Sequence, residues 1–294
     1  RHVAPLREAM MGCDAVVHAA ASTPLYTRED IMTTNLDGTR NVLQAALDLG
    51  IERVIHLSSA EVYGVPDHRL VVETDKLTGT GPYGEANIKA EAFCSSFREK
   101  DLCLAVLRPV PVVGPGRLGV LSLFFDWAQD GHNFPLIGTG ENRYQLLDVA
   151  DLCEAIWACL TLDQAVVNDT FNLGATKFST MKEDFQAILD QAGFGKRLIE
   201  FPALPTIWAL RALEAMHLSP LHRFLFETAA VETSVNTEKA EQKLGFKPQY
   251  TNREALLRNF DWYTANLDSL KNKSGLSNHV PCSQGALGLV KYIF

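Results

Sequence analysis

Short apolar runs alternate with amphipathic stretches over the first 174 residues of the chain. Four runs are continuously apolar, as strands buried on both faces of a sheet are, and they span residues 14–20, 53–58, 102–108 and 170–173. Apolar positions at three- and four-residue spacing predict helices between these runs, at residues 35–49, 84–100 and 150–161. Because strand alternates with helix, the pattern predicts an α/β fold with a parallel, doubly wound sheet and right-handed crossovers.

The pattern changes after about residue 174. Apolar spacing there predicts helices at residues 180–192, 202–217, 237–244 and 253–266. We therefore expect an α/β domain at residues 1–174, a smaller and mainly helical region at 175–266, and a C-terminal tail at 267–294. Parts of residues 110–150 are expected to contribute to the smaller region.

Composition narrows the class of protein. The 294 residues are 47% apolar and 21% charged, as in ordinary soluble globular proteins. The net charge of -8 argues against nucleic-acid binding, which needs clustered Lys and Arg. No apolar stretch reaches the roughly 18 residues of a membrane span, and residues 1–13 do not have the pattern of a signal peptide. The six cysteines have no metal-ligand spacing, which favours a reducing, cytoplasmic location and no metal site.

Polar residues follow the second predicted strand directly, in the segment Ser58–Gly64. Ligands of parallel sheets bind beyond the carboxyl ends of the strands, so these side chains are placed to reach a ligand. The same residues could instead form a helix N-cap or a turn. About 20 residues later Tyr83 opens a predicted helix, where its hydroxyl could donate or accept a proton or its ring could simply pack.

Two further segments have the character of ligand loops. The third predicted strand runs into a Pro- and Gly-rich loop at residues 107–116, whose shape proline restricts. Arg143 lies in the segment 138–151 and suits bidentate contact with a phosphate or a carboxylate. An ion pair of Arg143 with Asp148 or Asp151 is the structural alternative.

In this order the four segments resemble the extended short-chain dehydrogenase/reductase family, which includes NAD-dependent sugar-nucleotide epimerases and dehydratases. The resemblance covers roughly residues 1–265, and its further matches are His18–Ala21, Asn35, Phe171–Gly174 and Lys243–Pro248. It implies a Rossmann-type NAD(P)-binding domain at 1–174 and a substrate-binding region at 175–266. It also implies NAD or NADP as cofactor, a small-molecule substrate, and a homodimer formed through the helices at 36–49 and 84–100.

The resemblance also implies a role for each matching residue. Ser59 matches the residue that hydrogen-bonds the reacting hydroxyl or carbonyl, Tyr83 the residue that passes the proton, and Glu61 an acid of the dehydratases. The implied cofactor contacts are Ala19, Ala20, Asn35, Ser58, Tyr83, Pro109, Val110 and Val112. The implied substrate contacts are Ser22 and Arg143.

The chain departs from the family pattern Tyr-x-x-x-Lys, because Asn87 stands four residues after Tyr83. The family's lysine holds the nicotinamide ribose and lowers the pKa of the tyrosine. Asn87 can hydrogen-bond a hydroxyl but carries no charge. Lys89 lies six residues after Tyr83, about 240° around a regular helix, so only an irregular helix start would let it substitute. We therefore expect a slow oxidation step, or chemistry that runs mainly as reduction.

A second departure is that no strand–GxxGxxG–helix unit is present in the sequence. In the family's strand order, strands one to three would precede Asp14. We therefore expect the natural protein to be N-terminally longer, by roughly 60 residues on a family-based estimate.

The leading functional hypothesis is an NAD(P)-dependent oxidoreductase or epimerase acting on a small polar substrate such as a nucleotide sugar. Ala60 stands where dehydratases also keep an Asp, which weakens the dehydratase variant. The apolar segment 201–226, and the lack of an Arg-Pro-Gly-Asp stretch in 224–235, favour a dehydrogenase of apolar alcohols, resembling the hydroxysteroid or dihydroflavonol branches. A non-catalytic nucleotide-binding scaffold is a third possibility, supported by Asn87.

Overall fold

The structure is a computed structural model that describes residues 3–66, 68, 70–215, 232, 234–270, 273, 275, 277, 279–282 and 291. The chain divides into two compact units. The first comprises residues 1–111, 150–174 and 234–249, and the second comprises 112–149, 175–233 and 250–294. Residues 234–249 therefore group with the sheet of the first unit, although they lie after residue 174 in the chain.

A four-stranded parallel sheet forms the centre of the first unit, in the order β1-β2-β3-β7. Its strands are β1 (Ala15–His18), β2 (Arg53–Leu57), β3 (Cys103–Pro109) and β7 (Thr170–Leu173). Every residue of β3 is buried, as expected for a central strand covered on both faces. The prediction of an α/β fold with a parallel sheet is confirmed.

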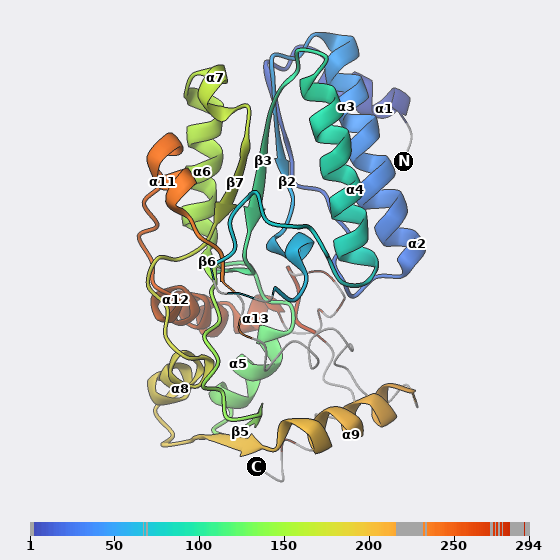
Figure 1. Ribbon diagram of the computed structural model, residues 1–294. Coiled ribbons are helices and arrows are strands. Elements are labelled where there is room, and N and C mark those ends of the chain that lie inside the picture. The colour runs from blue at the N-terminus through green and yellow to red at the C-terminus, as the bar shows by residue number, and fades with distance from the viewer. Residues whose placement is uncertain are drawn as a thin grey trace. The chain divides into compact units, whose positions relative to one another are not determined.

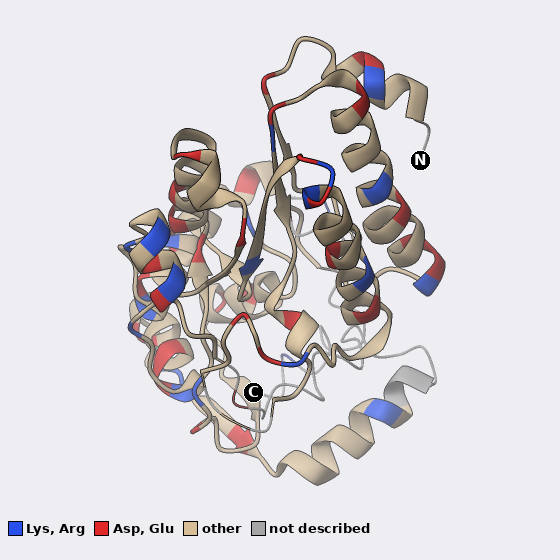
Figure 2. Cartoon of the chain, turned by 45° about the horizontal axis from the view of Figure 1, so that its top comes forward, with Lys and Arg blue, Asp and Glu red and all other residues tan. Residues whose placement is uncertain are grey.

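Helices cover both faces of this sheet (Figure 1). One face carries α1 (Val3–Met10), α3 (Gly38–Leu49) and α4 (Gly81–Arg98), and the other carries α6 (Val149–Thr161), α7 (Gln164–Val167) and α11 (Glu238–Leu244). The predicted helix at 35–49 is divided, because the short helix α2 (Arg28–Ile31) continues into a π-helical turn, η1 (Met32–Asp37), before α3 begins. Acidic and basic residues are interspersed along these helices (Figure 2).

The second unit combines helices with two small parallel sheets. β4 (Val112–Val113) pairs with β6 (Leu147–Asp148), and β5 (Phe134–Ile137) pairs with β8 (Leu198–Phe201). Its helices are α5 (Leu121–Gln129), α8 (Met181–Ala192), α9 (Ala203–Ala215), α12 (Asn252–Ala265) and α13 (Leu267–Leu270). Capping boxes begin α8 and α12, where Thr180 pairs with Glu183 and Thr251 with Glu254.

The sequence did not predict α5, either small sheet, or the helical turn α13 inside the expected tail. The end of the predicted helix 202–217, the segment 216–231 and most of the tail lie outside the described residues. Within the described part of the chain, no helix is long and apolar enough to cross a membrane, and no cluster of His, Cys, Asp and Glu could hold a metal ion. All six cysteines are free thiols.

Two histidines stand side by side on the neighbouring strands β1 and β2. His18 and His56 are register partners on β1 and β2, and their ring centroids lie 5.4 Å apart. His18 Nε2 lies 3.0 Å from the hydroxyl of Thr39, whereas both ring nitrogens of His56 have no partner among the described residues. Burial lowers the pKa of His18 to about 4, and burial together with the charges of His18 and Arg98 lowers the pKa of His56 to about 3.

These pKa values predict a protein that loses stability in mild acid. Both rings are neutral when folded, but they take up a proton below about pH 6.5 when unfolded, so the unfolded state binds more protons there. The loss of folding free energy therefore begins below pH 6.5 and continues down to about pH 4 for His18 and about pH 3 for His56. At pH 5 it amounts to about 2 kcal/mol for each histidine.

The measurement is urea unfolding at pH 7, 6 and 5. His56→Leu is expected to reduce the loss between pH 7 and 5 by roughly half. His279→Leu, a change at an exposed ring, serves as the control and is expected to leave the loss unchanged. An unaltered pH dependence in His56→Leu would show that this pair does not cause the acid sensitivity.

Candidate functional site

A tight turn follows β2 and holds two of the predicted site residues. Ser59 is the N-cap of the short helix η2 (Ala60–Tyr63), and its Oγ accepts a hydrogen bond of 3.1 Å from the backbone N–H of Glu61. The N-cap alternative from the sequence is therefore realised. A hydroxyl that accepts one hydrogen bond still has its own hydrogen to donate, so capping leaves Ser59 able to bind a ligand oxygen.

Glu61 is a partly exposed residue in the first turn of η2. Burial of its carboxyl raises the pKa to about 7. A carboxyl with such a pKa is about half protonated at neutral pH, so Glu61 can either give or take a proton under ordinary conditions.

A close contact between two glycines joins this turn to the start of α4. The N–H groups of Thr78 and Gly79 donate to the carbonyl of Val62, at 3.0 and 2.9 Å. A Cβ atom added to Gly84 would lie 2.7 Å from the carbonyl carbon of Gly79 and 3.2 Å from the carbonyl oxygen of Glu61. Only glycine permits this approach, and it brings the start of α4, with Tyr83, beside the turn that contains Ser59.

One face of α4 carries Tyr83, Asn87 and Glu91, because residues four apart lie about 40° from one another on a helix. Asn87 is only 4% exposed, and its Nδ2 has no hydrogen-bond partner among the described residues. A buried amide donor without a partner is costly, so this atom is suited to an acceptor that arrives with a ligand. Lys89 cannot take this place, since it lies on the exposed side of a regular helix, 2.8 Å from Glu85.

The loop after β1 is fixed by Asn35 in the π-helical turn. The side-chain carbonyl of Asn35 accepts from the N–H of Ser22 at 2.7 Å, and its amide donates to the carbonyl of Ser22 at 3.1 Å. Asn35 and Ser22 are both buried, whereas Ala19 and Ala20 are exposed. The effect is a rigid loop that presents small apolar side chains at the carboxyl end of β1, a surface against which a flat ring can lie.

The other predicted contacts belong to the end of β3 and to the second unit. Pro109 and Val110 are buried, and the N–H of Val110 donates to the carbonyl of Leu173 at 2.9 Å. Val112 begins β4 in the second unit, which also contains Arg143. The exposed guanidinium of Arg143 donates to the carbonyl of Phe178 at 2.9 Å and lies 4.6 Å from the centre of the Phe178 ring.

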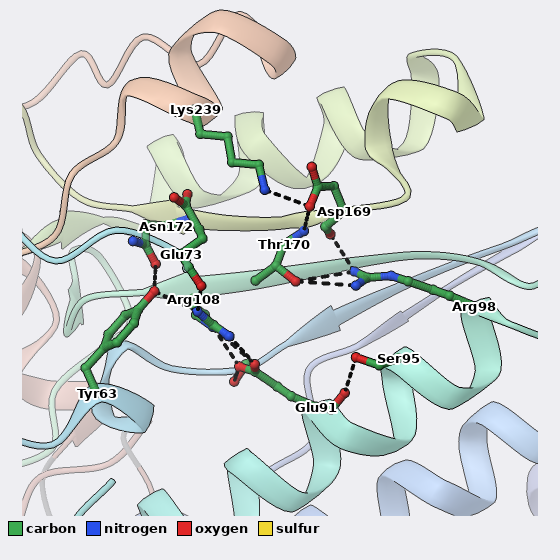
Figure 3. Close-up of polar contacts among 11 residues, drawn as sticks. Tyr63, Glu73, Glu91, Ser95, Arg98, Arg108, Asp169, Thr170, Asn172 and Lys239 are labelled. Atoms are coloured by element: carbon green, nitrogen blue, oxygen red, sulfur yellow. Dashed lines mark hydrogen bonds and ion pairs between the residues drawn. The ribbon is translucent and has the colours of Figure 1, made fainter. Parts of the chain in front are cut away.

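Sequence reasoning missed a buried ion pair beneath the turn. Arg108 donates to both carboxylate oxygens of Glu91, and its Nη1 donates to the hydroxyl of Tyr63 at 2.7 Å (Figure 3). Ser58 is buried as well, and its hydroxyl donates to Glu91 Oε1 at 2.5 Å. The signal in the sequence was an arginine inside the continuously apolar run 102–108, which a buried strand tolerates only with a partner.

These features fit a dinucleotide cofactor. The unpartnered amide of Asn87 suits a ribose hydroxyl, and the exposed alanines after β1 suit an aromatic base. Ser59 supplies a hydrogen-bond donor, and Glu61 and Tyr83 are groups that can exchange protons.

Comparison with known proteins gives a consistent result. The sequence model of the family described as "NAD dependent epimerase/dehydratase family" matches residues 3–174. The Sinorhizobium fredii protein named "Uncharacterized protein y4nG" is 32% identical over 292 residues, which are 98% of this chain and 72% of that protein. The dTDP-glucose 4,6-dehydratase of Streptomyces niveus is 27% identical over 266 residues, covering 88% of this chain and 72% of the dehydratase.

Among solved structures, DesIV, a dTDP-glucose 4,6-dehydratase from Streptomyces venezuelae crystallised with NAD, is similar with a TM-score of 0.74. The two chains are 24% identical, and the similarity covers 92% of this chain and 79% of DesIV. At this level of identity the structural similarity shows the fold alone.

The glycine contact yields a prediction about the assembly of the site. Gly84→Ala places a methyl group against the backbone of Gly79, so α4 must move away from the turn; the expected cost is about 1–3 kcal/mol of folding free energy. Gly38→Ala is the matched control, because its Cβ would meet only one atom, at 3.8 Å, and alanine favours the helix by up to about 1 kcal/mol. Chemical unfolding measures both changes. A Gly84→Ala protein as stable as Gly38→Ala would contradict the contact.

Proposed function

This chain belongs to the NAD-dependent epimerase/dehydratase family, and on that premise we propose that it is an enzyme that uses NAD to modify a nucleotide sugar. The observation that carries the proposal is the packing of the turn with Ser59 and Glu61 against the first turn of α4, which carries Tyr83. Relatives named as dTDP-glucose dehydratases and as a decarboxylase of a UDP-linked sugar acid support a nucleotide sugar as the substrate.

In this proposal Ser59 donates a hydrogen bond to the reacting oxygen of the sugar, and Tyr83 exchanges the proton of that oxygen. NAD, when bound, supplies the hydride acceptor, and in its reduced form the hydride donor. Asn87 donates to a ribose hydroxyl, Ala19 and Ala20 line the place of the base, and Pro109, Val110 and Val112 line the nicotinamide. Ser58 and Asn35 act through the segments that they fix, and Arg143 and Ser22 face the substrate.

Glu61 is the second proton-exchanging group of the proposed site. Its pKa of about 7 lets it act as an acid or a base on a carbon or oxygen atom next to the one that Tyr83 serves. The proposal also keeps the division predicted from the sequence, with cofactor binding assigned to residues 1–174 and substrate binding to residues 175–266. It further includes a homodimer formed through α3 and α4, which sedimentation can test.

The test uses the full-length protein with NAD and either dTDP-glucose or UDP-glucose as probe. Product formation, followed by mass spectrometry and chromatography, is expected for the natural protein and is expected to fall about 10²–10⁴-fold in Tyr83→Phe. A protein that binds neither NAD nor a nucleotide sugar would contradict the proposal and favour a scaffold. Binding of NAD with turnover of apolar alcohols alone would assign the protein to the other substrate class.

Asn87 leads to a prediction about the direction of the reaction. A tyrosine with the ordinary pKa of about 10 is ionised in about one molecule in a thousand at pH 7, which makes it a poor base for oxidising an alcohol. Asn87→Lys is expected to accelerate NADH formation about tenfold for each unit by which the cation lowers the pKa of Tyr83. Asn87→Asp, of nearly the same shape, is expected to slow it.

The readout is the initial rate of NADH formation at several pH values, with Lys89→Gln as the control that leaves the rate unchanged. Thermal unfolding of each variant shows whether it is folded. Equal rates in folded Asn87→Lys, Asn87→Asp and natural protein would show that charge at position 87 does not limit oxidation.

A further inference from the structure

A single buried carboxylate links three parts of the proposed site. The side chains of Glu91 and Arg108 are 7% and 6% exposed, and Arg108 Nη2 lies 2.5 Å from Glu91 Oε2. The second oxygen of Glu91 accepts from Ser58 as well as from Arg108 Nε, at 2.5 and 3.0 Å. Arg108 on β3 therefore donates to both oxygens of this carboxylate, and Ser58, directly after β2, donates to one of them, while Glu91 itself belongs to α4 (Figure 3).

The arginine extends the link to the far end of the turn. Arg108 Nη1 donates to the hydroxyl of Tyr63 at 2.7 Å and to the carbonyl of Glu73 at 3.1 Å. The same Tyr63 hydroxyl donates to the side-chain carbonyl of Asn172 on β7 at 2.7 Å. The residue before Ser59 and the last residue of η2 are thus both tied to one ion pair, so the turn is held at its two ends.

The ion pair also fixes the rotation of α4 about its own axis. Glu91 lies two turns after Tyr83, about 80° from it around the helix, and one turn after Asn87. A rotation or a slide of α4 that moved Tyr83 would have to break the bonds between Glu91 and Arg108. The hydrogen bonds between the guanidinium and the carboxylate are directional, so they restrain the orientation of α4 in a way that apolar side chains of the same size would not.

Stability alone gives little reason for this arrangement. A buried ion pair often adds no stability over apolar residues of similar volume, because desolvation offsets the attraction, although loss of one partner is strongly destabilising. We propose that Glu91 and Arg108 are positioning residues that hold Tyr83 and Asn87 of α4 in register with Ser59 and Glu61 of the turn. This inference rests on the proposed function for its catalytic consequence, but its structural consequence can be measured without any substrate.

The test compares single with paired substitutions in the full-length protein. Glu91→Gln leaves the Arg108 charge unpaired and is expected to lower the Tm. The double variant Glu91→Leu/Arg108→Met removes both charges and is expected to regain much of that Tm. If the pair is only structural, a double variant with a recovered Tm recovers every other property as well.

If the pair positions α4 and the turn, the double variant differs from the natural protein even when its Tm is recovered. Hydrogen–deuterium exchange measures that difference directly. In the double variant the amides of residues 60–64 and 83–88 are expected to exchange at least about tenfold faster than in the natural protein, at equal global stability. Turnover of the nucleotide-sugar probe is expected to fall about 10²-fold with little change in KM, because the reacting groups are displaced while the binding surfaces remain. Ser95→Ala is the matched control, because Ser95 lies on the same helix and its hydroxyl donates to the backbone carbonyl of Glu91 and not to its carboxylate.

Natural exchange at these amides in a double variant with recovered Tm would overturn the inference. If the double variant does not fold, the exchange measurement uses Glu91→Gln instead, at a temperature where circular dichroism shows that this variant is folded. Exchange at residues 60–64 and 83–88 that equals that of the natural protein would again overturn the inference. If the variants show the faster exchange but the natural protein turns over no probe, the proposed function is contradicted and the positioning role of Glu91 and Arg108 stands.

Discussion

The site depends on the burial of one ion pair at the carboxyl end of a parallel sheet. Glu91 and Arg108 come from a helix and a strand that the chain could join in many relative orientations. Buried charges are tolerated only when they are paired with good hydrogen-bond geometry, so few of those orientations are compatible with the pair. Ser58 is hydrogen-bonded to Glu91 and Tyr63 to Arg108, so the turn between Ser58 and Tyr63 is restrained by the same ion pair. The glycine contact between residues 79 and 84 then determines how closely the turn and the helix approach.

Much of the first unit could be predicted from the sequence because its signals are local. Continuously apolar runs predicted the four strands, and residues such as Ser59 could be located because ligands bind beyond strand ends. The resemblance to the family, carried by several short motifs in order, is confirmed by the family comparison. The second unit was predicted less well, since β4 and β6 have two residues each and too short a pattern to detect.

The interactions that assemble the site could not be predicted, because they are tertiary. Nothing near Glu91 in the sequence indicates that its partner is Arg108, and the role of Gly84 depends on Gly79 across a turn. Asn35 was predicted as a cofactor contact from a motif, and the structure adds that its side-chain amide holds the backbone of Ser22. For Asn87 the sequence showed the missing charge, and the structure adds that the amide is buried with an unpartnered donor. An amide at this place can donate a hydrogen bond to a hydroxyl but carries no positive charge.

The central claim is that the strand ends, the turn at Ser59 and the first turns of α4 form one site for NAD. Hydrogen–deuterium exchange of the full-length protein with and without saturating NAD tests it most directly. The account predicts slower exchange in residues 19–22, 59–63 and 83–88, with no comparable change in helix α9. Binding of NAD that leaves those three segments unprotected would contradict the account.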